Sequence, residues 1–298
     1  MLNPRQIEAF RAVMVTGGIT SAAKVMHISQ PAVSRLIHDL QHAVSLTLFE
    51  RRGTRLLPTS EALALYREVE LQFIGLERIA QTARDLREGR TGTLRIAAMP
   101  ALAVGFLPRF AGRFLKARPK LNLALFAGVS TGVLDWIETG HCEIGFAHSL
   151  TESTAVVAEK LTPVPAVAIV PMEHPLASRR VVTPEDFRGE SFIAPEATLP
   201  MRHHIDVIFA QAGVVCDIRA ETHASMIACG LVASGGGISI VDPFSALEFA
   251  GRSVVARPFA PCIQFDIVLL RSAHRTLSPS AQEFVEGFRA ELDQFARR

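Results

Sequence analysis

A set of polar side chains near the N-terminus recurs at helical spacing. Between residues 29 and 40 the apolar residues form one stripe of a helix, and the opposite arc carries Gln30, Ser34, Arg35 and His38. Glutamine can pair bidentately with adenine, arginine with guanine, and serine with bases or phosphates. The arc therefore suits contact with base edges in a DNA groove, although a solvated helix face is the commoner use of such an arc.

The elements before this helix would have to position it. The stripe of Ile7, Phe10 and Met14 predicts an amphipathic first helix that ends at glycines 17–18. Thr20 can cap a short second helix.

A three-residue connection leads from the second helix into the polar one. Ser29 is a suitable N-cap for it, and Pro31 is tolerated in its first turn. A short helix, a tight turn and a following helix form a helix-turn-helix unit, whose second helix enters the major groove of DNA.

The residues that follow add a basic hairpin. Residues 46–59 predict two short strands around Gly53, and three arginines there could grip backbone phosphate: Arg51, Arg52 and Arg55. Residues 1–58 carry seven basic and three acidic side chains, a net charge of +4. The other 240 residues carry 24 and 26, a net charge of −2. A basic N-terminal module on a near-neutral body indicates a polyanionic partner.

The N-terminal segment resembles the DNA-binding segment of LysR-type transcriptional regulators. It contains the alanine pair at 22–23, the run SQPAVSR, the run LFER and the Pro-Thr that opens the next helix. The rest of the 298-residue chain matches that family in length and layout. The resemblance implies a mixed fold, with a winged helix-turn-helix, a long dimerising linker helix and a two-lobed α/β effector domain that resembles periplasmic binding proteins.

The same resemblance implies domain boundaries, DNA contacts and partners. The domains would be 1–58 for DNA binding, 59–89 for the linker helix and 90–298 for the effector, with one lobe at about 90–161 and 267–298 and the other at about 162–266. The DNA contacts would be Thr20, Gln30, Pro31, Ser34, Arg35, His38, Arg51, Arg52, Arg55 and Thr59. The expected partners are a pseudo-palindromic double-stranded operator, a small-molecule effector, further copies of the chain in a dimer or tetramer, and RNA polymerase.

One long helix is predicted from Thr59 to Glu88, closed by Gly89. An apolar seam with alternating spacings of three and four runs along it, interrupted only by Gln72. The seam consists of Ala62, Leu65, Val69, Gln72, Leu76, Ile79, Ala83 and Leu86. Such a seam is typical of a coiled coil between two copies of the chain. The alternative is a long helix that packs on its own domain.

Strands and helices alternate over the last two thirds of the chain, which predicts βαβ units in two lobes joined by two crossing strands. The predicted strands are 93–98, 121–126, 143–147, 161–170, 191–194, 217–220, 238–241 and 264–270. One helix is predicted to begin near Pro108. The other predicted helices are 131–138, 201–212, 223–234, 243–249 and 279–295. Ligands of such sheets bind beyond the carboxyl ends of the strands, where helix N-termini point their N–H groups into the cleft.

Four strand-to-helix turns are predicted to meet in that cleft: 99–102, 128–131, 197–200 and 221–224. Four hydroxyls on them could hold a carboxylate together with backbone N–H groups: Ser130, Thr131, Thr198 and Thr222. Each of these hydroxyls could instead be a helix cap. The turn at Pro100 and Ala101 would offer only backbone and shape.

The runs RIAAMPALAVGFLPRF and GGGISIVDPFSALEFA resemble most the regulators of opine catabolism and of lysine biosynthesis. That resemblance implies a basic or opine-like amino acid as the effector. Asp242 follows a predicted strand and is our choice as counter-charge for the ligand amine, with Glu221 as second choice. An N-cap before Pro243 is an equally plausible role for Asp242, and both roles could coexist.

Other functional classes find little support in the sequence. The four cysteines have no CxxC spacing, the ten histidines have no metal-ligand spacing, and neither a nucleotide-loop motif nor GxSxG occurs. No signal peptide and no membrane-length apolar run is present. We therefore expect a cytoplasmic, effector-responsive regulator without enzymatic activity, cofactor or metal. The alternatives are a solute-binding protein and an α/β enzyme built on the two lobes.

Overall fold

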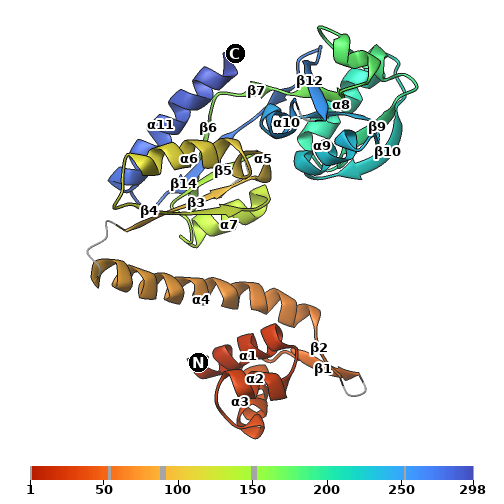
Figure 1. The fold of residues 1–298 in the computed structure, drawn as a ribbon. Helices are drawn as coiled ribbons and strands as arrows, with labels where there is room; N and C mark the ends of the chain where they lie inside the picture. The colour runs from red at the N-terminus through yellow and green to blue at the C-terminus, as the bar shows by residue number, and fades with distance from the viewer. Residues whose placement is uncertain (1, 53–54, 88–91, 149–152, 252, 298) are drawn as a thin grey trace. The chain divides into compact units, whose positions relative to one another are not determined.

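The computed structural model describes residues 2–52, 55–87, 92–148, 153–251 and 253–297 (Figure 1). The side chains at 51, 52 and 55 and most of those from 71 to 87 lie outside what it describes. The chain divides into two compact units, Met1–Arg84 and Asp85–Arg298, and each is described by itself.

The N-terminal unit consists of three helices, a hairpin and the start of a long helix. These elements are α1 (Pro4–Thr16), α2 (Ile19–Val25), α3 (Gln30–Val44), β1 (Phe49–Arg52), β2 (Arg55–Pro58) and α4 (Ser60–Arg87). Strands β1 and β2 are antiparallel, with Arg52 opposite Arg55. The predicted helix-turn-helix with a wing is thereby confirmed, and so is the long helix that follows. The predicted end of that helix at Glu88 and Gly89 lies outside the described residues.

The helix boundaries follow from their caps. Helix α1 ends at Gly17, whose φ of 73° is in the left-handed region that glycine adopts without strain. The Ser29 hydroxyl accepts a hydrogen bond from the backbone N–H of Ala32, so the predicted cap of α3 is confirmed. The predicted cap at Thr20 is wrong. Helix α2 already begins at Ile19, after an extended Gly18, and Thr20 therefore lies inside its first turn.

Helix α4 begins packed against α1. Arg11 Nε donates to Glu70 Oε1 at 2.6 Å, and the Phe10 and Tyr66 rings meet edge to face. Ala62 and Val69, from the first half of the predicted seam, are buried in the apolar cluster of this unit. For that half of the seam the alternative interpretation therefore applies, in which the long helix packs on its own domain.

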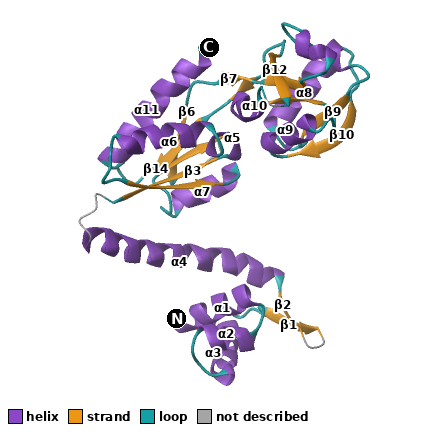
Figure 2. Cartoon of the chain, viewed as in Figure 1, coloured by secondary structure: helices purple, strands orange, loops and turns teal. Residues whose placement is uncertain are grey.

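The C-terminal unit contains two five-stranded sheets, one in each lobe (Figure 2). The first has the order β4-β3-β5-β14-β6 and the second β10-β9-β11-β8-β12, and a two-stranded pair, β13-β7, connects the lobes. In each large sheet four strands run in one direction, and the fifth, β14 or β8, runs antiparallel to both of its neighbours. The strands are β3 (Thr93–Ala98), β4 (Asn122–Ala127), β5 (Ile144–Ala147), β6 (Val156–Lys160), β7 (Val164–Pro165), β8 (Val167–Pro171), β9 (Ser191–Pro195), β10 (Asp217–Thr222), β11 (Ile238–Val241), β12 (Val254–Pro258), β13 (Gln264–Phe265) and β14 (Val268–Ser272).

Helices cover both faces of each sheet because successive strand residues point to opposite faces. In β3, Leu94 and Ile96 contact the cluster that contains α6 and α11, whereas Ala97 contacts the cluster that contains α7. In the second lobe α8 covers one face and α9 the other. The helices are α5 (Pro100–Ala103), α6 (Phe106–Lys116), α7 (Ser130–Glu138), α8 (Pro200–Gln211), α9 (Ser225–Ala233), α10 (Pro243–Phe249) and α11 (Pro279–Ala296), with short 3-10 turns at Pro175–Ser178 and Pro184–Phe187.

The strand predictions are wrong where the chain crosses between the lobes. The single strand predicted at 161–170 is two strands, β7 and β8, and the one predicted at 264–270 is likewise β13 and β14. Pro163 and Pro165 lack the N–H that a continuous ladder would use, so pairing is interrupted there. Strands β6 and β12 were not predicted. The predicted return of the chain to the first sheet is confirmed by β14.

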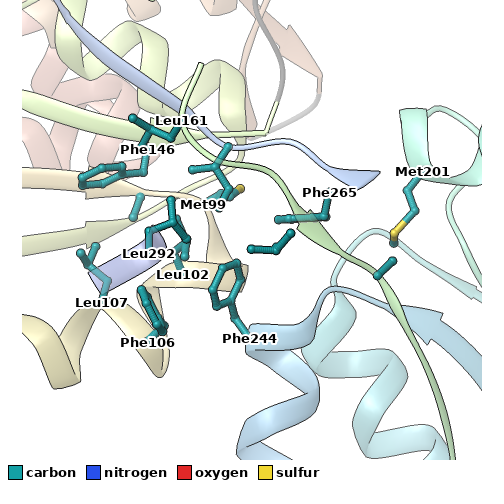
Figure 3. Packing of buried hydrophobic residues seen from close by; sticks show 14 of the residues in the cluster. Met99, Leu102, Phe106, Leu107, Phe146, Leu161, Met201, Phe244, Phe265 and Leu292 are labelled. Carbon is teal, nitrogen blue, oxygen red and sulfur yellow. The ribbon is translucent and has the colours of Figure 1, made fainter. Parts of the chain in front are cut away.

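The two lobes share apolar packing around the crossing strands. Figure 3 shows a cluster that extends from Phe146 in the first lobe past Phe244 and Phe265 to Met201 in the second. Phe106 and Phe244 have ring centroids 4.9 Å apart, and Arg109 forms an ion pair with Glu248 across the same boundary. Among the described residues, no helix is long and apolar enough to span a bilayer.

Candidate functional site

The outer face of α3 presents the predicted base-contacting side chains. Gln30, Ser34, Arg35 and His38 are exposed, while the apolar stripe of the same helix is buried in the core of the unit. Arg35 keeps most of its side chain in solvent and lies 3.9 Å from Asp39, a weak pairing that leaves its guanidinium available. Pro31 and Thr20 are also exposed.

The remaining predicted DNA contacts lie at the hairpin. Arg51, Arg52 and Arg55 are strand residues beside the turn, and their side chains are outside the described ones. The Thr59 hydroxyl donates to the carbonyl of Thr47 at 2.8 Å and accepts from the N–H of Ala62 at 3.1 Å. Thr59 therefore joins the hairpin to the start of α4. Its hydroxyl oxygen has one lone pair left, which can accept a hydrogen bond from a water molecule bound to a DNA phosphate.

In the C-terminal unit a cavity of about 310 Å³ lies between the two lobes. All four predicted turns contribute to its wall, through the starts of α5 and α7 from one lobe and of α8 and α9 from the other. Of the predicted ligand residues, those that line it are Pro100, Ala101, Ser130, Thr198 and Asp242.

Five helices in the described parts of the chain start at this cavity, and all but α10, which Asp242 caps, have apolar N-cap residues. These are Met99, Val129, Leu199 and Ala224, and within the described structure none makes a side-chain capping hydrogen bond. Helices α3 and α11, whose starts are elsewhere, are capped by serine hydroxyls. First-turn N–H groups without a side-chain acceptor attract an anion, so the wall is suited to a carboxylate.

The predicted hydroxyls differ in what they can still donate. Ser130 Oγ accepts from the backbone N–H of His148 at 3.2 Å, which leaves the hydroxyl proton free for a ligand oxygen. Thr198 Oγ1 lies 3.1 Å from Glu196 Oε1 and donates its proton there. Thr131 is exposed outside the cavity lining. Thr222 accepts from the N–H of Ala224 at 3.3 Å and lies on an adjoining hollow of about 20 Å³.

Asp242 is completely buried and forms part of the cavity wall. Its Oδ1 accepts from the Ser245 N–H at 2.8 Å and its Oδ2 from the Ser245 hydroxyl at 2.9 Å, so the N-cap role is confirmed. The Ser225 hydroxyl also bonds to it, and burial raises the pKa of the carboxyl group despite these bonds. Glu221, the second choice, is paired with Arg202 at 2.8 Å and is absent from the cavity lining of the described structure.

Four polar residues of the cavity were not among the predicted ligand contacts: His148, Glu196, His223 and Ser225. Two of them directly follow strands. Glu196 follows β9 directly and contributes a partly exposed carboxylate, and His148 follows β5 directly. Asp242 was chosen because it directly follows a predicted strand. Glu196 and His148 also directly follow strands, so the same criterion could have found them. His148 Nδ1 lies 2.9 Å from the carbonyl oxygen of Asp266, and its ring stacks on Phe265. Because a carbonyl only accepts, the Nδ1 carries the proton.

The cysteines and other metal-binding residue types form no site of their own. All four cysteines are free thiols, and burial raises the pKa of Cys142 and Cys229 to about 12. Among the described residues no group of three or more histidines, cysteines or carboxylates could hold a metal ion.

Comparison with known proteins identifies the family. Residues 4–63 match the model of bacterial regulatory helix-turn-helix proteins of the lysR family, and residues 87–293 match that of the LysR substrate binding domain. The chain is 41% identical over 287 residues to the octopine catabolism/uptake operon regulatory protein OccR of Rhizobium meliloti, covering 96% of this chain and 95% of that protein.

Two further comparisons agree with this result. The chain is 36% identical over 283 residues to the transcriptional activator protein LysR of Escherichia coli (strain K12), covering 95% of this chain and 91% of that protein. The crystal structure of full-length CbnR complexed with its target DNA has a similar fold, with a TM-score of 0.76 at 20% identity, over 96% of this chain and 98% of that one. The predicted fold class is therefore confirmed, and the chain is a transcriptional regulator of the LysR family, with a helix-turn-helix domain and an effector-binding domain.

Proposed function

We propose that the chain binds a pseudo-palindromic operator in the cytoplasm as a dimer or tetramer, and that an amino acid or opine-like derivative in the cleft sets its activity. The observation that carries the effector proposal is the convergence of four uncapped helix starts, the Ser130 hydroxyl and the Glu196 carboxylate on one cavity. In this proposal the chain binds its ligand without transforming it, and the domains divide at about residues 58 and 89.

The carboxylate of the ligand would lie at the start of α7. There the Ser130 hydroxyl accepts from His148 and could donate to a ligand oxygen, and no side chain caps the first turn of α7. Pro100 and Ala101 form the apolar wall beside it. Thr131 and Thr222 would support the turns on which they lie rather than touch the ligand.

The amine of the ligand would face a carboxylate on the other lobe. Glu196 is the partly exposed carboxylate of the cavity wall, and Thr198 orients it by donating to Oε1. Asp242, a buried part of the same wall, holds the starts of α9 and α10 through Ser225 and Ser245. A ligand that contacts both Ser130 and Glu196 would bridge the two lobes. It would therefore bind more tightly when the lobes are close together than when they are apart.

The similarity to OccR, whose name refers to octopine catabolism, supports this ligand class. The exposed arc of α3, with Gln30, Ser34 and Arg35, would enter the major groove, and the wing arginines would hold phosphate. A dimer matches the two half-sites of the operator, and RNA polymerase would be the downstream partner.

The test is a thermal-shift screen of the full-length protein against amino acids, opine-type amino acids and organic acids that lack an amine. Ligand at one hundred times its Kd should stabilise the C-terminal unit by about 2.7 kcal/mol. Ser130→Ala, Glu196→Gln and Asp242→Ala should each weaken binding, Asp242→Ala at least tenfold, whereas Thr131→Ala is the matched control. A hit for an aromatic or aliphatic acid, with none among the amino acids, would eliminate the proposed effector class.

A further inference from the structure

A second, smaller cavity adjoins the effector cleft. Its volume is about 160 Å³, and it shares His148 and Met201 with the main cavity. Whole small-molecule sites usually measure about 300–1000 Å³, so this side compartment has room for one arm of a ligand rather than for a separate ligand.

The crossing strand β13, with the residue that follows it, separates the two compartments. Phe265 lines the main cavity, whereas its neighbours Gln264 and Asp266 line the side compartment, because successive residues of an extended chain point to opposite sides. His148 is fixed between them by its stacking on Phe265 and its bond to the Asp266 carbonyl. Met201 is the adaptable part of the shared wall, since its thioether side chain is unbranched and flexible.

Two features of the side compartment attract an anion, and one carboxylate, Asp266, opposes it. Lys160 contributes an ammonium group, and the compartment lies at the first turn of the 12-residue helix α8, through Pro200 and Met201. The N-cap of that helix, Leu199, offers no side-chain acceptor, so no side-chain cap satisfies the N–H groups at the positive end of the helix.

The existing partner of Lys160 is held only loosely. Lys160 Nζ is 3.9 Å from Asp266 Oδ2, longer than the roughly 2.7–2.9 Å of a direct charge-assisted hydrogen bond. The two side chains are 66% and 48% exposed, and exposed pairs of this kind contribute little to stability. A ligand carboxylate can therefore take the place of Asp266 beside Lys160 at small cost.

We propose that the side compartment is a second carboxylate subsite with Lys160 as its counter-charge. The effector then has a carboxylate and an amine in the main cavity and a second carboxylate on an arm that passes His148 and Met201. This inference rests on the proposed function, and it selects the opine-like type, with two carboxylates, over a basic amino acid. Asp266 opposes the second carboxylate and so limits the affinity for it.

The experiment is calorimetric titration of the full-length protein with four amino acids. Norleucine has no second polar group, lysine has a second ammonium group, and 2-aminohexanedioate and 2-aminoheptanedioate have a second carboxylate at two lengths. The better of the two dicarboxylates should bind at least about fivefold more tightly than norleucine, and lysine should show no such gain.

Three variants distinguish a subsite from a general effect. Lys160→Gln should abolish the advantage of the dicarboxylate and leave the Kd for norleucine within about twofold. Asp266→Asn should tighten dicarboxylate binding, because it removes a like charge. Lys116→Gln, an exposed position at the end of α6 outside both cavity linings, is the control and should change nothing.

Two outcomes overturn the inference while the proposed function stands. In one, norleucine binds as tightly as both dicarboxylates. In the other, lysine is the amino acid that binds most tightly, and Asp266→Asn weakens the binding of lysine. That result would make the compartment a cation site. If none of the four amino acids binds, the proposed effector class fails and the second subsite fails with it.

Discussion

Replacing Asp242 with alanine should destabilise the C-terminal unit by about 2–4 kcal/mol. Losing a side-chain N-cap costs about 1 kcal/mol, and leaving the buried Ser245 hydroxyl without its acceptor costs about 1–3 kcal/mol more. Both apply here, because the carboxylate caps α10 through the Ser245 N–H and also accepts from the hydroxyls of Ser245 and Ser225. Asp242→Asn keeps an equally good capping residue and should remain within about 1 kcal/mol of wild type.

The pH dependence gives a second measurement of the same residue. Burial raises the pKa of Asp242, so the folded state holds its proton more tightly than the unfolded state, where the value is about 3.9. The stability that this group contributes is fully present below the unfolded pKa and is lost as pH rises through the folded one. Wild type should therefore lose stability relative to Asp242→Asn as pH rises above about 4.

Urea unfolding followed by tryptophan fluorescence measures both effects in the full-length protein. Trp136 is the chain's single tryptophan and lies in α7, so its emission reports on the C-terminal unit. Midpoints and slopes give the free energy of unfolding for wild type, Asp242→Ala, Asp242→Asn and the single-hydroxyl control Ser245→Ala at each pH. An Asp242→Ala variant within about 0.5 kcal/mol of wild type would refute the capping argument. Parallel pH curves for wild type and Asp242→Asn would refute the direction of the pKa shift.

Three further experiments test the remaining parts of the molecule. Arg35→Ala should cost about 1–3 kcal/mol of binding free energy at the cognate operator and relax sequence specificity there. Arg52→Ala should weaken binding to all DNA sequences alike and reduce the salt dependence of binding. Gel shifts in which Arg35→Ala binds its operator as tightly as wild type would exclude the exposed face of α3 as the recognition surface. A coiled coil along α4 predicts that Ile79→Glu, at a side chain 66% exposed in the single chain, reduces the oligomer in light scattering. Val69→Glu, in contrast, should also unfold the N-terminal unit, where Val69 is buried. Iodoacetamide at pH 8 should label Cys262, the exposed thiol, well before the other three, whose pKa values burial raises to about 11–12, as peptide mass spectrometry can show.

The pattern of apolar residues predicted most elements of both units. Strand 93–98, strand 238–241 and helix 243–249 have the bounds that periodicity and flanking residues indicated. Such features depend on neighbours within a few residues, and the exposed arc of α3 is a direct consequence of helical periodicity. The convergence of the four turns was also predictable, because the carboxyl ends of parallel strands meet at one edge of a sheet.

The tertiary structure alone decided which groups remain available for a ligand. The Ser130 hydroxyl oxygen accepts from the N–H of His148, 18 residues away, and Asp242, which is completely buried, bonds to the Ser225 hydroxyl. The division of the α4 seam depends on contacts such as Arg11 with Glu70, 59 residues apart. A residue's type and spacing set what it can bind. Its actual partner, burial and charge come from chain segments that only folding brings within bonding distance.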